Sequence, residues 1–303
     1  MALLLSIFIT QIAPILLAAG AGFTVGRAFK VDLRSISRIT FYIFSPCLVF
    51  VSLYETRLTG EEFGRMAVFT VGVVGLLGCA AFAFGKTIGL NQPTLVGLII
   101  VTMFGNGGNY GLPLTLFAFG QEALARAVIY YVVSTICVYS VGIIIASSGR
   151  ATLRQSVLGI FKLPVLYGVI LAVTLRLVNL ELPLPIFRAA QLLSQAALPV
   201  MLIVLGLQLA EAKRPDNLRT VAIASIFQLV SGPTIGLLMA ALLGLSGPAR
   251  QAAVLEAAMP AAVITTILAV EYDLDPVFVT GTVLVTTLLS PLTLVPLIAF
   301  LQS

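Results

Sequence analysis

Long apolar stretches, separated by short charged or turn-rich segments, recur along the whole of this 303-residue chain. Each stretch is close to the roughly 20 residues that an α-helix needs to cross the hydrocarbon core of a bilayer. The pattern therefore predicts an all-α integral membrane protein with ten transmembrane helices. We expect these helices at residues 3–26, 37–55, 65–86, 94–120, 125–147, 158–178, 189–210, 219–244, 250–271 and 277–301.

The fourth stretch contains a segment that disfavours a continuous helix. Residues 105–113 read Gly-Asn-Gly-Gly-Asn-Tyr-Gly-Leu-Pro, and Pro113 lacks the N–H group that a helix interior requires. Each glycine costs about 1 kcal/mol relative to alanine in such a helix. In hydrocarbon, a broken backbone is tolerated where protein buries it or where it lines a cavity. We therefore expect helix 4 to be interrupted at Pro113 and to form part of a transport site, as discontinuous helices do in many secondary transporters.

Three pairs of prolines recur in the same order in the two halves of the chain. Their offsets are 150, 153 and 147 residues, and the pairs are Pro14–Pro164, Pro46–Pro199 and Pro113–Pro260. The spacing predicts two repeats of five helices each, residues 1–148 and 158–303. Because five is an odd number, the second repeat must be inverted in the membrane relative to the first. Helices 4 and 9 would then cross near the bilayer midplane, each interrupted at its proline.

Composition narrows the class of protein further. Hydrophobic residues make up 59% of the chain and charged residues 10%, whereas soluble domains carry about 25% charged residues. Because histidine and a Gly-x-Ser-x-Gly motif are both absent, we predict no enzyme, cofactor or metal centre. The net charge of +5 lies in loops, which does not suggest a nucleic-acid partner. A channel or a signalling receptor stays an alternative, although most helices lack the polar stripe of a continuous pore.

The distribution of Lys and Arg predicts the orientation in the lipid. The loops after odd-numbered helices carry 11 of these residues, and the opposite side carries 6. Because positively charged loops are retained in the cytoplasm, we expect both termini on the outer side.

Polar side chains at membrane depth mark the candidate substrate site, because they are costly in lipid and usually functional. Asn106 and Asn109 are three residues apart. They either contact the substrate or satisfy backbone groups that the glycines and Pro113 leave free. Tyr110 either supplies a hydroxyl group to the substrate or only packs against neighbouring side chains. Together with Pro113 and Pro260, these residues form the predicted substrate-binding set.

Glu256 is the only carboxylate well inside a predicted helix, one turn before Pro260. An ionised and unpaired carboxylate there would cost several kcal/mol, so Glu256 should be protonated, paired or bound to a cation. We therefore predict that Glu256 couples transport to Na⁺ or H⁺, and that any Na⁺ lies near Glu256 and Met259. If helix 9 begins later in the chain, Glu256 lies merely at the membrane interface.

These motifs resemble those of the auxin efflux carrier family, whose bacterial members are thought to export or import small organic acids. The family's fourth helix carries an Asn followed by Gly-x-Pro, which Asn106 and residues 111–113 match. Residues 256–260 match its ninth-helix signature. Further matches lie at Tyr272, at Asp275 and Pro276 and, in helix 7, at residues 196–199 and 205–207.

The resemblance implies the ten-helix inverted-repeat fold, shared in outline with the bile acid sodium symporters. It also implies a scaffold of helices 1, 2, 6 and 7, a transport domain of helices 3–5 and 8–10, elevator-like alternating access and a homodimer. For a bacterial member, it implies the inner (plasma) membrane. In the bile acid symporters a ninth-helix glutamate binds Na⁺, and Glu256 lies in a similar place. Plant carriers usually have glutamine there and a long central loop, and an auxin-like uncoupled carrier is the alternative.

Overall fold

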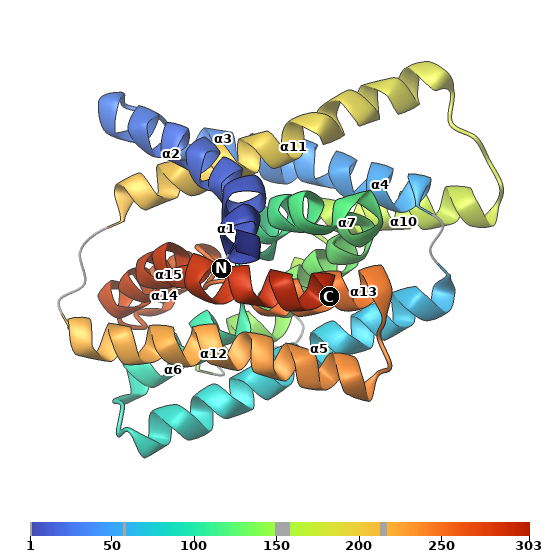
Figure 1. The fold of residues 1–303 in the computed structure, drawn as a ribbon. Coiled ribbons are helices and arrows are strands. Elements are labelled where there is room, and N and C mark those ends of the chain that lie inside the picture. The colour runs from blue at the N-terminus through green and yellow to red at the C-terminus, as the bar shows by residue number, and fades with distance from the viewer. Residues whose placement is uncertain (1, 57–58, 149–157, 213–216) are drawn as a thin grey trace.

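The computed structural model describes residues 2–56, 59–148, 158–212 and 217–303, which form helices joined by short loops (Figure 1). Within these ranges the only β-type contact is a single isolated bridge, so the predicted all-α class is confirmed. Five of the Lys and Arg residues that were counted for the orientation lie outside the described ranges, namely Arg57, Arg150, Arg154, Lys213 and Arg214.

The first half of the chain contains several long helical rods, some of which include a short π-helical turn (η). Its described elements are α1 (Ala2–Ile7), η1 (Phe8–Ile12), α2 (Ala13–Ala28), α3 (Leu33–Ile39), η2 (Thr40–Phe44), α4 (Ser45–Glu55), α5 (Gly60–Thr87), α6 (Gln92–Met103), η3 (Gly107–Gly111), α7 (Leu112–Cys137), η4 (Val138–Gly142) and α8 (Ile143–Ala146). The second half contains α10 (Pro164–Leu177), α11 (Leu184–Glu211), α12 (Leu218–Leu242), α13 (Gly247–Ala257), α14 (Ile264–Tyr272) and α15 (Pro276–Gln302).

Seven helical segments of the described residues are long and apolar enough to cross a membrane. They are Ala2–Ala28, Leu33–Glu55, Gly60–Thr87, Gly107–Ala146, Leu184–Glu211, Leu218–Leu242 and Pro276–Gln302, and the shorter apolar helices α6 and α10 accompany them. The segment Gly107–Ala146 is 40 residues long and changes direction at Gly120, where φ is 78°. Glycine adopts this left-handed conformation without the steric penalty of a Cβ. The kink lies where the sequence predicted the end of helix 4.

The interruption of predicted helix 4 lies earlier than the sequence indicated. α6 ends at Met103, and the helix resumes at Gly107. The prediction of a break at Pro113 was wrong, because Pro113 lies inside the continuous run of η3 and α7. Directly before it, the N–H of Leu112 donates to the carbonyl of Gly107, five residues back. This wider turn accommodates a residue that cannot donate a hydrogen bond.

The other interruption lies where it was expected. α13 ends at Ala257 and α14 begins at Ile264, so Pro260 falls in the gap between them. Pro260 cannot continue the hydrogen-bond ladder of α13. Predicted helix 9 is therefore two half-helices.

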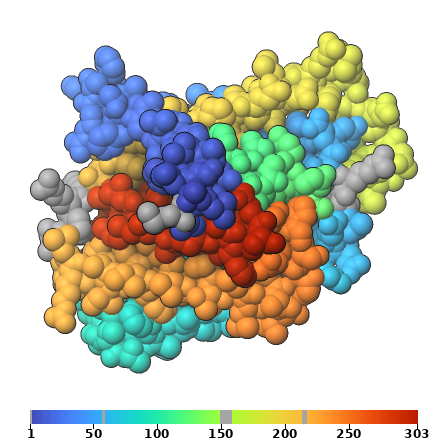
Figure 2. Space-filling view, viewed as in Figure 1, coloured from blue at the N-terminus to red at the C-terminus, as the bar shows by residue number. Residues whose placement is uncertain are grey.

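The helices are arranged on two sides of a central group. In Figure 1, α2, α4, α10 and α11 lie on one side and α5, α6 and α12 on the other, with α7, α13 and α15 between them. The space-filling view in Figure 2 shows α1 resting on α15, and the two helices are in contact. The close packing of α2 on α11 depends on Gly206, because a Cβ there would overlap the carbonyl oxygen of Ala19. Small residues at such crossings let helix backbones approach.

Candidate functional site

The two interrupted segments meet and pair through their backbones. Gly105 and Ala261 form an isolated antiparallel bridge. The N–H of Asn106 donates to the carbonyl of Pro260 at 2.7 Å, and the N–H of Ala262 donates to the carbonyl of Phe104 at 2.9 Å. These bonds satisfy polar groups that two broken helices would otherwise leave unpaired in an apolar interior. The crossing therefore stabilises both breaks at once.

Close approach at the crossing requires glycine on one side. A Cβ at Gly105 would lie only 3.0 Å from the carbonyl oxygen of Met259. That carbonyl accepts a hydrogen bond from Nε2 of Gln228 at 2.8 Å, so a third segment, α12, supports the crossing from behind. Gln228 is only 2% exposed, and the sequence analysis did not single it out.

Two half-helices begin at the crossing with free N–H groups. The helical run of η3 and α7 starts at Gly107, and α14 starts at Ile264, both without a side-chain cap. Among the described residues, no acceptor bonds the backbone N–H of Gly108, Asn109, Val263 or Ile264. Uncapped N–H groups and the positive end of the helix dipole make such a terminus favourable for anions.

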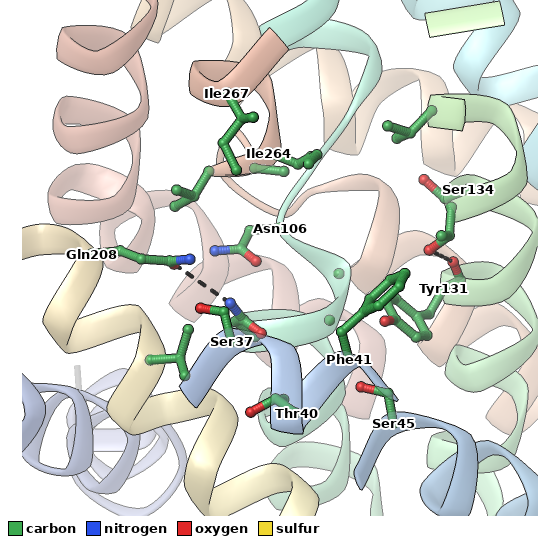
Figure 3. Close-up of a pocket in the computed structure, with 18 of the residues that line it drawn as sticks. Ser37, Thr40, Phe41, Ser45, Asn106, Tyr131, Ser134, Gln208, Ile264 and Ile267 are labelled. Carbon is green, nitrogen blue, oxygen red and sulfur yellow. Dashed lines mark hydrogen bonds between the residues drawn. The ribbon is translucent and has the colours of Figure 1, made fainter. Parts of the chain in front are cut away.

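A cavity of about 430 Å³ opens directly beside these termini (Figure 3). Its wall combines backbone from both half-helices with polar and aromatic side chains of α3, η2, α4, α7, η4 and α11. The residues that line it include Ser37, Arg38, Thr40, Phe41, Ser45, Asn106, Gly108, Asn109, Tyr131, Ser134, Thr135, Tyr139, Gln208, Val263 and Ile264. Figure 3 shows Asn106 and Gln208 directed toward the same space.

The two predicted asparagines both line this cavity, and they differ in their partners. Asn106 is 5% exposed, and its Nδ2 has no hydrogen-bond partner in the described ranges. Nδ2 of Asn109 donates to Oε1 of Gln208 on α11 at 3.5 Å. Neither amide bonds a described backbone group, so the alternative in which they satisfy the broken backbone is not what the structure shows.

The other predicted substrate residues do not line the cavity. Tyr110 is fully buried, and its hydroxyl oxygen accepts a hydrogen bond from Ser290 at 3.1 Å. Pro113 is buried within α7. Pro260 contributes its carbonyl group to the crossing. These three residues shape the region around the cavity.

Glu256 packs against η3 and does not line the cavity. Its side chain is fully buried at the end of α13 inside the protein. Because α13 begins at Gly247, this helix does not begin later than the sequence predicted, which was the condition for an interfacial Glu256. The Thr115 hydroxyl donates to Oε1 at 3.4 Å, and Oε2 has no hydrogen-bond partner among the described residues. A Cβ at Gly107 or at Gly111 would lie 2.5 Å from Oε2. Since Gly107 also lines the cavity, a single glycine separates the carboxyl group from it.

Sequence reasoning missed several residues of the cavity. Of the described residues that line it, Arg38 is the only charged one, yet the sequence analysis counted it among the loop charges. Gln208 lies in the last turn of the apolar helix α11 and belongs to no motif that the sequence analysis used. Both reach the site because α3 and α11 pack beside the crossing, and no local signal in the sequence predicts that contact.

Comparison with known proteins identifies the family. A sequence profile described as membrane transport protein matches residues 7–157 and 147–298, which is nearly the whole chain. The chain belongs to the auxin efflux carrier family. The resemblance drawn from the motifs is thereby confirmed, and the protein is a multi-pass membrane transporter.

Relatives of this carrier match over most of their length. An uncharacterized transporter of Methanothermobacter thermautotrophicus is 29% identical over 271 residues, 88% of each chain. An uncharacterized transporter of Methanocaldococcus jannaschii is 27% identical over 264 residues, 85% of this chain and 86% of the relative. A Rhizobium meliloti protein, named provisionally as a malonate transporter, is 28% identical over 275 residues, 86% of this chain and 85% of the relative.

Proposed function

We propose that this carrier is a secondary active transporter of a small organic anion, a carboxylate, that binds in the cavity beside the crossing. The observation that supports this most directly is the pair of uncapped half-helix N-termini at the cavity wall, next to the buried and unpartnered Nδ2 of Asn106. A buried amide donor without a partner is costly, and a ligand carboxylate would satisfy it. The provisional name of the Rhizobium relative agrees with an organic anion.

Each group at the site has a role in this proposal. The N–H groups of Gly108 and Asn109 at one terminus, and of Val263 and Ile264 at the other, bind the carboxylate oxygens. Asn106 and Asn109 orient the substrate through their side-chain amides. Tyr110, Pro113 and Pro260 keep the crossing in shape without contacting the ligand.

The proposed architecture is two inverted five-helix repeats with a scaffold of predicted helices 1, 2, 6 and 7. In the structure these four correspond to α2, α4, α10 and α11. The grouping of these helices on one side in Figure 1 supports this division. The bond from Asn109 to Gln208 then joins the transport domain to the scaffold, and an elevator-like movement would break it.

We propose a homodimer in the plasma membrane with both termini outside. In that orientation the cavity opens toward the cytoplasm, since it lies between the cytoplasmic halves of the helices that line it.

Coupling to Na⁺ or H⁺ is assigned to Glu256 in this proposal. A carboxylate that is fully buried, with one oxygen unpartnered, is stabilised when a cation or a proton neutralises it. Glycines at 107 and 111 place this group against the helix that carries the substrate amides. Neutralisation of Glu256 would therefore favour the substrate-binding arrangement of η3, and the coupling is reciprocal.

The test of the binding site is carboxylate uptake by purified protein in proteoliposomes. We expect saturable uptake that is accelerated by substrate on the opposite side. We also expect Asn106→Ala to reduce the apparent affinity by about ten- to a hundredfold, the effect of losing one hydrogen bond to a charged group. Thr102→Val is the matched control, because Thr102 is a buried, unpartnered hydroxyl on α6 that does not line the cavity. Flux that neither saturates nor exchanges would instead indicate a channel.

The test of coupling uses the same vesicles. Glu256→Gln should abolish the Na⁺ or pH dependence of uptake, whereas Glu271→Gln, at an exposed position of α14, should retain it. Dependence that persists in Glu256→Gln would remove Glu256 from the mechanism and favour an uncoupled carrier.

A further inference from the structure

Arg38 lines the cavity but has no assigned role. It belongs to α3 and is the only charged side chain that the described residues contribute to the cavity wall. The ion pairs among the described residues are formed by Arg65 and Arg126, and no hydrogen bond from the Arg38 side chain to another described residue is present. Its guanidinium group, with five donors, is therefore available to a ligand.

The acidic groups nearest to Arg38 in the sequence and around the cavity do not neutralise it. Asp32 accepts hydrogen bonds from the backbone N–H of Arg34 and from the hydroxyl of Ser35. The bond from Ser35 holds the pKa of Asp32 below its usual range, so Asp32 is charged but already engaged. Glu271 is exposed on α14 and does not line the cavity. Among the described residues, the charged side chains that line the site therefore supply positive charge only.

The charge of the site can be compared with that of a ligand. Each half-helix N-terminus is equivalent to roughly half a positive charge, so the two at the crossing together supply about one. Arg38 adds a full charge to the same cavity from a separate helix, α3, since an arginine stays protonated. A monocarboxylate bound at the crossing would leave Arg38 without a partner. A ligand with a second acidic group would satisfy both the crossing and Arg38.

We infer that Arg38 is a specificity-determining residue that binds a second acidic group of the substrate, so that the site prefers dicarboxylates to monocarboxylates of similar size. This inference rests on the proposed function, because the first carboxylate is assigned to the crossing. One carboxylate binds the N–H groups and amides of η3 and α14, and the other accepts a bidentate pair of hydrogen bonds from the Arg38 guanidinium. The cavity of about 430 Å³ accommodates both groups and a short carbon chain between them.

The inference predicts a difference between two classes of ligand. Removal of the Arg38 charge should weaken dicarboxylate binding by about ten- to a hundredfold, the range for a lost hydrogen bond to a charged group. Monocarboxylate binding, which uses the crossing alone, should change by less than about threefold. The diagnostic measurement is therefore the ratio of the dicarboxylate and monocarboxylate affinities, rather than the overall activity of the carrier.

The experiment measures dissociation constants of the purified full-length protein for dicarboxylates and monocarboxylates of three to six carbons, by calorimetry and by thermal shift. Arg38→Gln is the main variant, and Arg38→Lys, which retains the charge but not the bidentate fork, should give an intermediate loss. Arg34→Gln is the matched control, because Arg34 lies one turn earlier on α3 and does not line the cavity. The elution profile and the melting temperature of each variant establish that it is folded.

The outcomes separate this inference from the proposed function. Loss of dicarboxylate preference in Arg38→Gln, with preference retained in Arg34→Gln, supports the role of Arg38. If both ligand classes bind and Arg38→Gln keeps the wild-type preference, Arg38 is only an interfacial anchor and the inference is wrong, while the proposed function stands. If no carboxylate of the series binds the wild-type protein, the proposed function is wrong and this inference fails with it.

Discussion

The glycines that face Glu256 predict a defect confined to ion coupling. Gly107 and Gly111 are one turn apart, and both leave space that the Glu256 carboxyl group fills. A Cβ at Gly111 would lie 2.5 Å from Oε2 and 2.6 Å from Oε1. Because Cβ atoms do not approach other heavy atoms within 3.0 Å, Gly111→Ala must displace the carboxyl group.

The magnitude follows from where the carboxyl group can move. Glu256 is fully buried, and a retreat along η3 is limited because Gly107 lies at the same close distance. Overpacking of this kind costs about 1–3 kcal/mol, and alanine recovers up to about 1 kcal/mol through its higher helix propensity. The net destabilisation is therefore between about 0 and 3 kcal/mol. If the overpacking cost of about 1–3 kcal/mol falls on the position of the carboxyl group that binds the coupling ion, the affinity for that ion weakens about 5- to 150-fold.

The assay is the dependence of carboxylate uptake on Na⁺ concentration and on pH, measured in proteoliposomes with Gly111→Ala. Gly75→Ala on α5 is the control, because a Cβ at Gly75 has no atom within 4 Å. Glu256→Asp should partly rescue Gly111→Ala, since its shorter side chain withdraws from the new methyl group, and a double-mutant cycle measures this coupling. The reasoning is refuted if Gly111→Ala retains the wild-type ion dependence, or if the double variant shows no rescue.

Two further predictions concern packing and charge, and both use thermal unfolding in detergent. Gly206→Ala should destabilise the protein by about 1–3 kcal/mol, because its Cβ would overlap the backbone oxygen of Ala19, which cannot rotate away,. Gly20→Ala on the same pair of helices has no atom within 4 Å and should be neutral or slightly stabilising, so equal effects would contradict this. Arg126→Gln should cost about 1–3 kcal/mol, because the 9% exposed side chain of Arg126 pairs with two carboxylates at 2.8 Å,. Arg65→Gln breaks an exposed pair and should cost less than about 1 kcal/mol,, and a similar loss in both would refute the distinction.

Local sequence was sufficient for features that depend on short-range chemistry. The all-α class follows from apolar stretches that can satisfy their backbone only as helices in lipid. The interruption at Pro260 follows from the missing N–H of that residue,. Asn106 and Asn109 were found because amides are unusual in an apolar stretch, and both line the cavity.

The place of the first break depended on a partner that is distant in sequence. The glycines and Pro113 weaken the helix over residues 105–113, and local propensity does not choose one position within that range. The pairing with residues 260–262 chooses it, because Asn106 and Ala262 donate their N–H groups across the crossing. Pro113 instead sits after a wide turn that tolerates it.

The sequence by itself determined a helical membrane carrier, its family motifs and a break in each of two apolar segments. Only the tertiary structure decided that the breaks pair with each other, that the cavity lies beside them, and that Arg38 and Gln208 complete its wall. The physical reason is that helical periodicity and residue propensity act over a few residues. The contacts of α3 and α11 with the first of the two breaks join segments about 70 to 100 residues apart, through packing that no local pattern encodes.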